Sequence, residues 1–436
     1  MGSNARHFLR GSFNIRGLLI GLAGVVAVAG IARSCALGTV GANTKTHLTF
    51  WNGFTGPDGV VMLEIIKQFN AQNPDVEVSM QRIPWATYYN KLTVAGSDGR
   101  GPDVFISHAD AMGRIRRSGF MADVTNLYDS AVNLNDFDSY VTNFIKIKGK
   151  YYGVPLDVHS QGMYLNEDML KKAGFDHPPT NKAEFMDLIK KATLEPGNGR
   201  NEKQWAFAFT YWGANFRSLV PQFGGRFLDD KGNAVYNSPE NVEVLEFLGS
   251  LSKNNQAPPP DNQLRWVGFR TGRVAMVWDG IFMLGDLLRV APDFKYIGAP
   301  IPQIGKFKAT TGNSHVMCIN SHLTPDKREK AERFIKYLSD HSLEWAAAGQ
   351  VPARLSIRQS EDFKKLQVQH AFSLDIPKIL YPPKSPKVFE LVQAMDLAVE
   401  SVIRGKATAK QALDAANKTA QDVIDRDRKE YPEDQE

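Results

Sequence analysis

Residues 47–107 read HLTFWNGFTGPDGVVMLEIIKQFNAQNPDVEVSMQRIPWATYYNKLTVAGSDGRGPDVFIS, and this stretch decides the fold. Three short runs rich in β-forming residues alternate with two segments whose apolar residues recur at helical spacing. The loop Gly53–Gly59 is rich in turn formers, and Asn73–Asp75 ends the first helical segment. This order implies a parallel sheet with helices on its faces, which is an α/β fold. We expect strands over 47–51, 76–80 and 103–107, and helices over 61–69 and 88–95.

The rest of the chain continues in the same style. Short apolar runs predict strands over 152–156 and 163–165. Asn181, Ser238 and Thr324 each stand where a helix N-cap is expected, and Pro follows directly at 239 and 325. The segment from Lys387 is predicted to be helical, with a break at Gly405.

Positive charge is concentrated at the N-terminus. The 436 residues contain 52 Lys+Arg and 47 Asp+Glu, a formal net charge of +5. Residues 1–34 hold four arginines and no acidic residue, so the remainder is nearly neutral. The uncharged run LLIGLAGVVAVAGIA at 18–32 follows the basic start, which is the layout of a secretory signal and is short of the ~20 residues of a membrane span. We therefore expect a targeting segment over 1–34, a tether over 35–45 and an extracytoplasmic protein.

Cys35 is one of only two cysteines, which excludes a disulfide framework. It is a candidate lipid attachment site, although Arg33 departs from the usual lipobox. Cleavage after Ala29 and an uncleaved N-terminal anchor are the alternatives. Cys318 lies between Met317 and Ile319, and we expect it to be buried in a strand.

Sequence motifs of enzymes are absent: there is no GxSxG, Walker A, HExxH or GxGxxG pattern. His108 with Asp110 and Asp157 with His159 each offer two metal ligands, but zinc sites need three or four. We accordingly expect no metal, no cofactor and no catalytic residues. A hydrolase that uses two carboxylates stays open as an alternative, because acidic residues are spread over the chain.

Aromatic and small polar residues stand beside the predicted loops. Ligands of open α/β sheets bind beyond the carboxyl ends of strands, where several of these residues fall. Aromatic faces stack on the CH surfaces of sugars, while Asp, Asn and His side chains bond to their hydroxyls. The combination favours a neutral polyol over a phosphate or a nucleic acid.

A series of short motifs resembles the family 1 extracellular solute-binding proteins, the sugar-binding components of bacterial ABC importers. They occur in the family's order over roughly 47–425: LTFWNGFTGPDG at 48–59, FNAQNPD at 69–75, IPW at 83–85, GPDV at 101–104, YGVPL at 152–156, YLN at 164–166, FRTGRVAM at 269–276, WDG at 278–280, FIKYL at 334–338 and QVPAR at 350–354.

The resemblance implies a two-lobed periplasmic-binding-protein fold of type II, with discontinuous lobes joined by hinge crossings. Lobe one would comprise 46–155 plus 316–375, and lobe two 156–315 plus 376–430. The ligand would bind between the lobes, favour their closed arrangement and be delivered to a membrane permease. We expect a monomer that binds no nucleic acid.

The candidate ligand-binding residues combine aromatic, acidic, histidine and arginine side chains: Trp51, Asn52, Asp58, His108, Asp110, Asp157, His159, Trp212, Trp278, Asp279, His315 and Arg354. Each has a structural alternative: the tryptophans as core residues, Asp58 as a helix cap and Arg354 as a salt-bridge partner. Trp85 and Tyr88 are interpreted as packing residues.

The expected ligand is a mono- or oligosaccharide. A phosphate should bring several Arg or Lys residues to the cleft, whereas Arg354 is the only basic candidate. Glycerol 3-phosphate or a glycerophosphodiester is the alternative ligand. A secreted glycan hydrolase and a sensor or adhesion lipoprotein are the alternative functions.

Overall fold

The computed structural model describes residues 45–97, 99–197, 201–260 and 264–432. The predicted export signal and Cys35 lie outside these residues. Within the described ranges, no helix has the length and apolar character that crossing a membrane requires.

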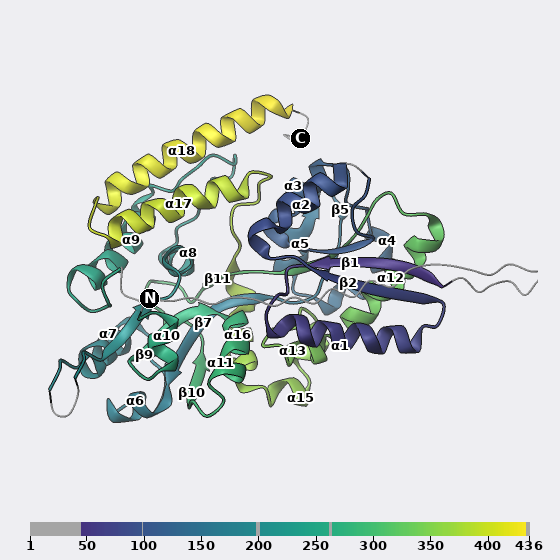
Figure 1. Ribbon diagram of the computed structural model, residues 1–436. Coiled ribbons are helices and arrows are strands. Elements are labelled where there is room, and N and C mark those ends of the chain that lie inside the picture. Colours follow the sequence, from purple (N-terminus) through teal and green to yellow (C-terminus); the bar gives the residue numbers. More distant parts are fainter. Residues whose placement is uncertain (1–44, 98, 198–200, 261–263, 433–436) are drawn as a thin grey trace, which may run out of the picture. The chain divides into compact units, whose positions relative to one another are not determined.

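The first sheet begins with the predicted β-α-β-α-β unit, and the predicted strands and helices of this stretch are confirmed (Figure 1). The central strand pairs in parallel with both of the others. The first connection runs from the central strand to one neighbour, and the second runs back across the central strand to the other neighbour. Because both connections are right-handed and run in opposite directions, their helices lie on opposite faces of the sheet. The elements are β1 (Thr46–Asn52), α1 (Pro57–Gln72), β2 (Val76–Arg82), α2 (Trp85–Ser97) and β3 (Val104–His108).

Two later strands complete this sheet in the order β2-β1-β3-β12-β6. They are β12 (His315–Ile319) and β6 (Val154–Pro155), the latter shorter than predicted. The predicted parallel arrangement is confirmed for β1, β2 and β3, whereas β12 runs antiparallel to β3, which makes the complete sheet mixed. The register places His315 opposite His108, and the free thiol of Cys318 is buried in β12 as predicted.

The second sheet has the order β13-β11-β7-β9-β8, and β10 pairs with β7. Every residue of β7 is buried, and this strand runs antiparallel to β9, β10 and β11. The strands are β7 (His159–Asn166), β8 (Trp205–Phe209), β9 (Val274–Gly280), β10 (Tyr296–Ala299), β11 (Thr310–Asn313) and β13 (Ile379–Leu380).

The chain passes between the two sheets several times. It leaves the first after β6 and enters the second at His159, and it returns through Ser314 between β11 and β12. Buried apolar side chains form two clusters, one around Phe50 and Phe105 and the other around Phe207 and Trp278. The first cluster also includes buried residues of β7, β8 and β9, so apolar packing continues from the first sheet onto one face of the second. Two sheets linked by chain crossings constitute the two-lobed α/β fold.

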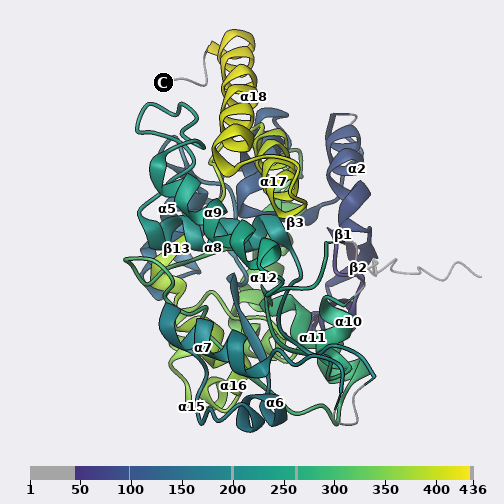
Figure 2. The same ribbon diagram turned by 90° about the vertical axis from the view of Figure 1, so that its left-hand side faces the viewer.

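The C-terminal helices α17 (Val388–Ile403) and α18 (Ala409–Glu430) lie side by side (Figures 1 and 2). The predicted break is confirmed at Gly405, where φ is +69°. A capping box at Thr408 and Gln411 starts α18. Both helices pack against α9 (Pro239–Lys253), and α17 also packs against α8 (Trp212–Phe223).

Asn181, Ser238 and Thr324 cap their helices as predicted, each accepting from the backbone N–H three residues on. The remaining helices are α3 (Met112–Arg117), α4 (Thr125–Ser130), α5 (Ser139–Ile145), α6 (Glu167–Lys172), α7 (Lys182–Ala192), α10 (Trp266–Arg270), α11 (Leu284–Val290), α12 (Pro325–Asp340), α13 (Ser342–Ala346), α14 (Leu355–Arg358), α15 (Glu361–Lys364) and α16 (Gln367–Ser373). Short 3-10 turns, η1 (Ala109–Ala111), η2 (Leu134–Asp136), η3 (Ile281–Met283) and η4 (Ile376–Lys378), and the hairpin β4 (Lys146–Ile147) and β5 (Lys150–Tyr151) complete the described elements.

Candidate functional site

Two adjoining pockets form a cleft lined by elements of both sheets. The first, the histidine pocket, has a volume of about 320 Å³ and is lined by Asp58, Trp85, His315 and Gln350 among others. The second, the side pocket, has a volume of about 310 Å³ and is lined by Asp110, Gln161, Tyr211 and Phe389 among others. His108, His159 and Phe282 line both pockets, so the two are direct neighbours.

Three histidines meet where the pockets join. His108 ends β3, His159 begins β7 and His315 begins β12, so both sheets contribute to the cluster. The ring centroids lie 4.5 Å (His159 to His315), 4.9 Å (His108 to His315) and 5.5 Å (His108 to His159) apart. The fold thus unites residues that are far apart in the sequence.

Asp157 connects two of the three histidines by hydrogen bonds and is fully buried. Its Oδ2 accepts hydrogen bonds from His315 Nδ1 and Trp345 Nε1, each at 2.7 Å. Its Oδ1 accepts from the His315 backbone N–H at 3.0 Å and from His159 Nδ1 at 3.3 Å. Burial by itself raises the pKa of Asp157, but the adjacent His315 and His159 outweigh it and hold that pKa below its usual range. Asp157 is therefore ionised and orients the two imidazoles.

Trp85 forms a wall of the histidine pocket. Its indole is stacked on the His315 ring, with centroids 5.7 Å apart and an interplanar angle of 12°, and lies 4.4 Å from the His108 ring. Gly53 makes room for it, because a Cβ at that position would lie 2.1 Å from the indole. The interpretation of Trp85 as a packing residue missed its position in the cleft.

Three large aromatic side chains of the cleft are strongly exposed: Phe282 (44%), Tyr211 (45%) and Phe389 (37%). None of them was a candidate from the sequence. Gly280 accommodates Phe282, since a Cβ there would lie 2.0 Å from its ring. The Trp-Asp-Gly motif at 278–280 thus stood next to the cleft, but the aromatic side chain that lines the pockets follows the glycine instead of preceding it.

The two acidic candidates Asp58 and Asp110 both line the cleft. Asp58 lies in the first turn of α1, where its Oδ1 accepts from the Gly56 and Gly59 backbone N–H groups at 3.0 and 2.8 Å. Burial raises the pKa of Asp58 and also that of Asp110.

Three buried oxygens of the cleft have no hydrogen-bond partner among the described residues. They are Asp110 Oδ1, Gln161 Oε1 and Gln350 Oε1. Buried polar atoms in folded proteins are nearly always hydrogen-bonded. These three acceptors are consequently available to hydroxyl donors of a ligand.

The other candidates lie outside the two pockets. Trp51 is half-buried against the apolar core, and Asn52 is buried with its Oδ1 accepting from Phe54 N–H at 3.1 Å. Trp212 packs between the guanidinium groups of Arg265 and Arg404. Neither tryptophan joins the histidine cluster.

The structure contradicts the expected cleft position of Trp278. It is fully buried between Phe185 and Phe207, because its side chain points to the core side of β9. Asp279 follows it, is also buried and accepts from Gly280 N–H at 2.7 Å. Burial raises the pKa of Asp279 to about 6.

Arg354 is a salt-bridge residue. Its Nε lies 2.6 Å from Asp136 and its Nη1 2.5 Å from Asp340. It lines neither pocket, so the alternative role named for it matches the structure.

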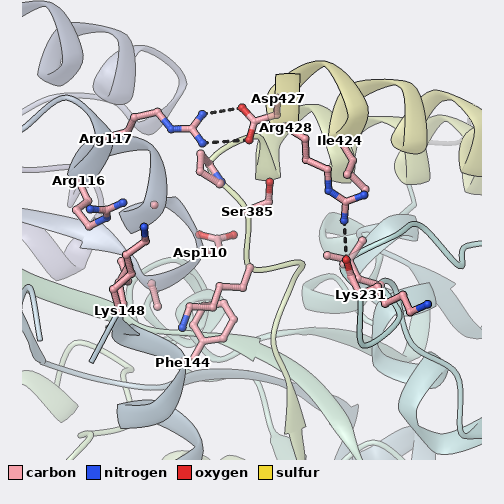
Figure 3. A pocket seen from close by; sticks show the side chains of 17 residues that line it. Asp110, Arg116, Arg117, Phe144, Lys148, Lys231, Ser385, Ile424, Asp427 and Arg428 are labelled. Carbon is pink, nitrogen blue, oxygen red and sulfur yellow. Dashed lines mark hydrogen bonds and ion pairs between the residues drawn. The ribbon is translucent and has the colours of Figure 1, made fainter. Parts of the chain in front are cut away.

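A third pocket, the basic pocket, has a volume of about 330 Å³ and adjoins the side pocket at Asp110. Figure 3 shows Arg116, Arg117 and Lys148 on one side and Lys231 and Arg428 on the other. Some of this charge is matched, since Arg117 forms two hydrogen bonds with Asp427 at 2.6 and 3.1 Å. The sequence did not reveal this gathering of cations because they come from segments more than 300 residues apart.

The fold and the interdomain cleft define the class of two-lobed binding proteins. Residues 64–368 match the family described as bacterial extracellular solute-binding protein, and the chain belongs to this family. The resemblance seen in the sequence is confirmed, and the family is one of extracytoplasmic binding proteins.

Individual relatives are distant in sequence. A maltotriose-binding protein of Pyrococcus abyssi is 24% identical over 366 residues, covering 82% of this chain and 77% of that protein. An arabinooligosaccharide-binding protein of Bacillus subtilis is 26% identical over 284 residues, covering 61% and 62% respectively. The structure of the sugar-binding protein MalE from Xanthomonas citri is similar with a TM-score of 0.78 at 21% identity, covering 89% of this chain and 99% of that one. This likeness confirms the two-lobed fold.

Proposed function

We propose that the chain is the substrate-binding component of an ABC importer and that it captures a mono- or oligosaccharide in the cleft. The observation that carries this proposal is the pairing of exposed aromatic faces with unpartnered acceptor oxygens. Phe282 and Tyr211 offer stacking surfaces, and Gln161 and Gln350 offer acceptors for hydroxyl groups. The sugar specificities named for the relatives from Pyrococcus abyssi and Bacillus subtilis support the same ligand class.

The proposed lobes are 46–155 plus the segment from 316, and 156–315 plus the C-terminal helices. We expected the second segment of lobe one to end at 375. Since α16 packs on β7 and β10, we place it with lobe two, so that this segment ends near Leu366. The ligand would bridge the lobes. It would stabilise their closed arrangement by the amount by which it binds the closed form more tightly than the open form. The closed monomer would then deliver the ligand to the permease, without catalysis.

Isothermal titration with a panel of ligands tests the proposal. The panel contains maltotriose, an arabinooligosaccharide, simple monosaccharides and glycerol 3-phosphate. We expect a neutral saccharide to bind, and we expect Trp85→Ala to weaken its binding about fivefold, because a stacking face worth roughly 1 kcal/mol is lost. Trp212→Ala is the matched control, because this half-buried tryptophan lies outside the cleft. Loss of binding in the control alone would refute the placement of the site.

A second candidate ligand is glycerol 3-phosphate or a glycerophosphodiester. The observation that favours it is the basic pocket next to Asp110, since Arg and Lys side chains are the usual partners of phosphate. Binding of the phosphate ligand without any neutral saccharide, abolished by Lys148→Ala, would select this candidate.

We further propose that Cys35 carries a lipid anchor after removal of residues 1–34. Incorporation of labelled palmitate into the cell-expressed protein, lost in Cys35→Ser, is the expected result. Release of unlabelled protein into the medium would instead indicate simple secretion.

A further inference from the structure

The histidine cluster has the composition of a transition-metal site. One ring nitrogen from each of His108, His159 and His315 lies within 4.8 Å of the other two. Tetrahedral Zn²⁺ bound at ~2.0–2.1 Å requires nitrogens about 3.4 Å apart, so the three rings would have to draw closer together around a bound ion. In the sequence, His108 and His159 belong to two separate pairs of possible ligands, and neither pair alone suffices for a metal. The fold brings these two histidines together with His315 into a set of three ligands.

Each of the three rings forms a hydrogen bond through its Nδ1 atom. His315 and His159 direct Nδ1 to Asp157, and His108 Nδ1 lies 2.6 Å from Tyr89 Oη. An imidazole that binds a metal ion through Nε2 keeps its proton on Nδ1, and Asp157 lies where its oxygens accept that hydrogen bond from His159 and His315. In a neutral imidazole that donates from Nδ1, Nε2 presents the lone pair that binds a metal ion.

Asp157 and Tyr89 therefore stand where supporting residues of a metal site stand. Metal-binding histidines usually donate their second ring N–H to a carboxylate, which fixes the ring and raises its basicity. Asp157 does this for two rings at once and is itself fixed by Trp345 Nε1 at 2.7 Å. A site that only packed three aromatic rings would need no such buried charge.

The surroundings of the cluster also suit a cation. Asp58 faces the same pocket and can contribute negative charge. Three imidazoles select zinc-class ions over Mg²⁺ and Ca²⁺, which prefer oxygen ligands.

We propose that His108, His159 and His315 bind one divalent transition-metal ion of the zinc class through Nε2, with a fourth coordination position open to the histidine pocket. This assignment does not depend on which solute the cleft captures. The open position gives a hydroxyl or carboxylate oxygen of a solute a place to coordinate.

Titration of the chelator-stripped full chain with Zn²⁺ tests the proposal by calorimetry. We expect one ion per chain, and at least a hundredfold weaker binding in His159→Gln and in His315→Gln. His322→Gln is the matched control, because this histidine is exposed and outside the cleft. Asp157→Asn should weaken binding ~10–100-fold while all three ligands remain. Absence of stoichiometric binding in the native chain, or unchanged binding in both histidine variants, would overturn the proposal.

X-ray absorption of the native chain loaded with Zn²⁺ gives an answer that needs no variant to fold. The expected spectrum has three imidazole ligands at ~2.0 Å and one further light ligand. A shell of oxygen ligands alone, or a single imidazole, would refute the site. Saccharide titrations with and without Zn²⁺ separate the two proposals. If the chain binds no metal, a saccharide can still be found to bind in a separate calorimetric titration, and the reverse also holds.

Discussion

Asp157→Asn should destabilise the protein strongly even without any ligand. The native carboxylate accepts from His315 Nδ1, Trp345 Nε1, His315 N–H and His159 Nδ1 in a fully buried position. An asparagine keeps one acceptor oxygen but turns an NH₂ group toward these donors. At least one buried donor then loses its partner, and two rings lose the negative charge that orients them.

The expected loss follows from the number of bonds affected. A hydrogen bond to a charged group contributes about 1.5–3 kcal/mol, and removing one partner from a buried charged network costs about 3–5 kcal/mol. We therefore expect the free energy of unfolding to fall by about 3–5 kcal/mol. In a chain of this size, that corresponds to a decrease in Tm of about 4–6 °C.

Urea unfolding in the presence of a chelator measures this loss without interference from metal. Tryptophan fluorescence and circular dichroism should report the same transition, which establishes that a single free energy applies. Asp129→Asn is the matched control, because Asp129 is exposed on α4 and should change the stability by less than about 0.5 kcal/mol. If Asp157→Asn cost no more than this control, the hydrogen-bond network described here would not support the fold.

Three further predictions concern other parts of the molecule. Trp278→Ala should lower the free energy of unfolding by about 3–5 kcal/mol because the indole is fully buried, whereas the half-buried Trp85→Ala should lower it less; equal losses in urea unfolding would contradict this. Folding raises the pKa of Asp279 from 3.8 to about 6, so its contribution to stability is present below about pH 4 and is lost as the pH rises through about 6. As the pH rises between these values, the free energy of unfolding of Asp279→Asn should increase relative to that of the native chain by up to about 3 kcal/mol. A pH-independent difference between the two in urea unfolding would exclude a neutral carboxyl at Asp279. Arg117→Ala removes the paired hydrogen bonds to Asp427 that join α3 to α18, and should increase the radius of gyration in small-angle scattering, where an unchanged radius would show that other contacts hold the cleft.

Local patterns in the sequence predicted most of the fold. The strands around Phe50 and Val104, the capped helices after Asn181 and Ser238, and the burial of Cys318 follow from short-range periodicity and turn chemistry. The antiparallel strand β12 was not predictable in this way. It pairs with β3 across more than 200 residues, and no local signal states the direction in which such a strand runs.

The site was predictable only in part, for a related physical reason. The candidates His108, at a strand end, and His315, where the chain returns to the first sheet, line the histidine pocket, whereas Asp157 is buried behind their rings. Trp278 sits at the end of an equally apolar strand but faces the core, because alternate residues of a strand face opposite sides. Sequence alone does not tell which face of β9 is packed against the core of its own lobe. Trp278 was therefore predicted to line the cleft, whereas the cleft aromatic is Phe282.

The cluster lies where the chain crosses between the sheets, and this position connects binding to the arrangement of the lobes. Asp157 belongs to the first crossing, while its partner His315 directly follows the return crossing at Ser314. His108 and His315 belong to the first sheet and His159 to the second. An ion that needs all three imidazoles at one distance binds only while the sheets keep this spacing, and it stabilises that arrangement by its differential affinity. A solute that contacts both Trp85 of the first lobe and Phe282 after β9 would also bind at one particular spacing of the two sheets. Metal and solute would then each favour the conformation that the other binds.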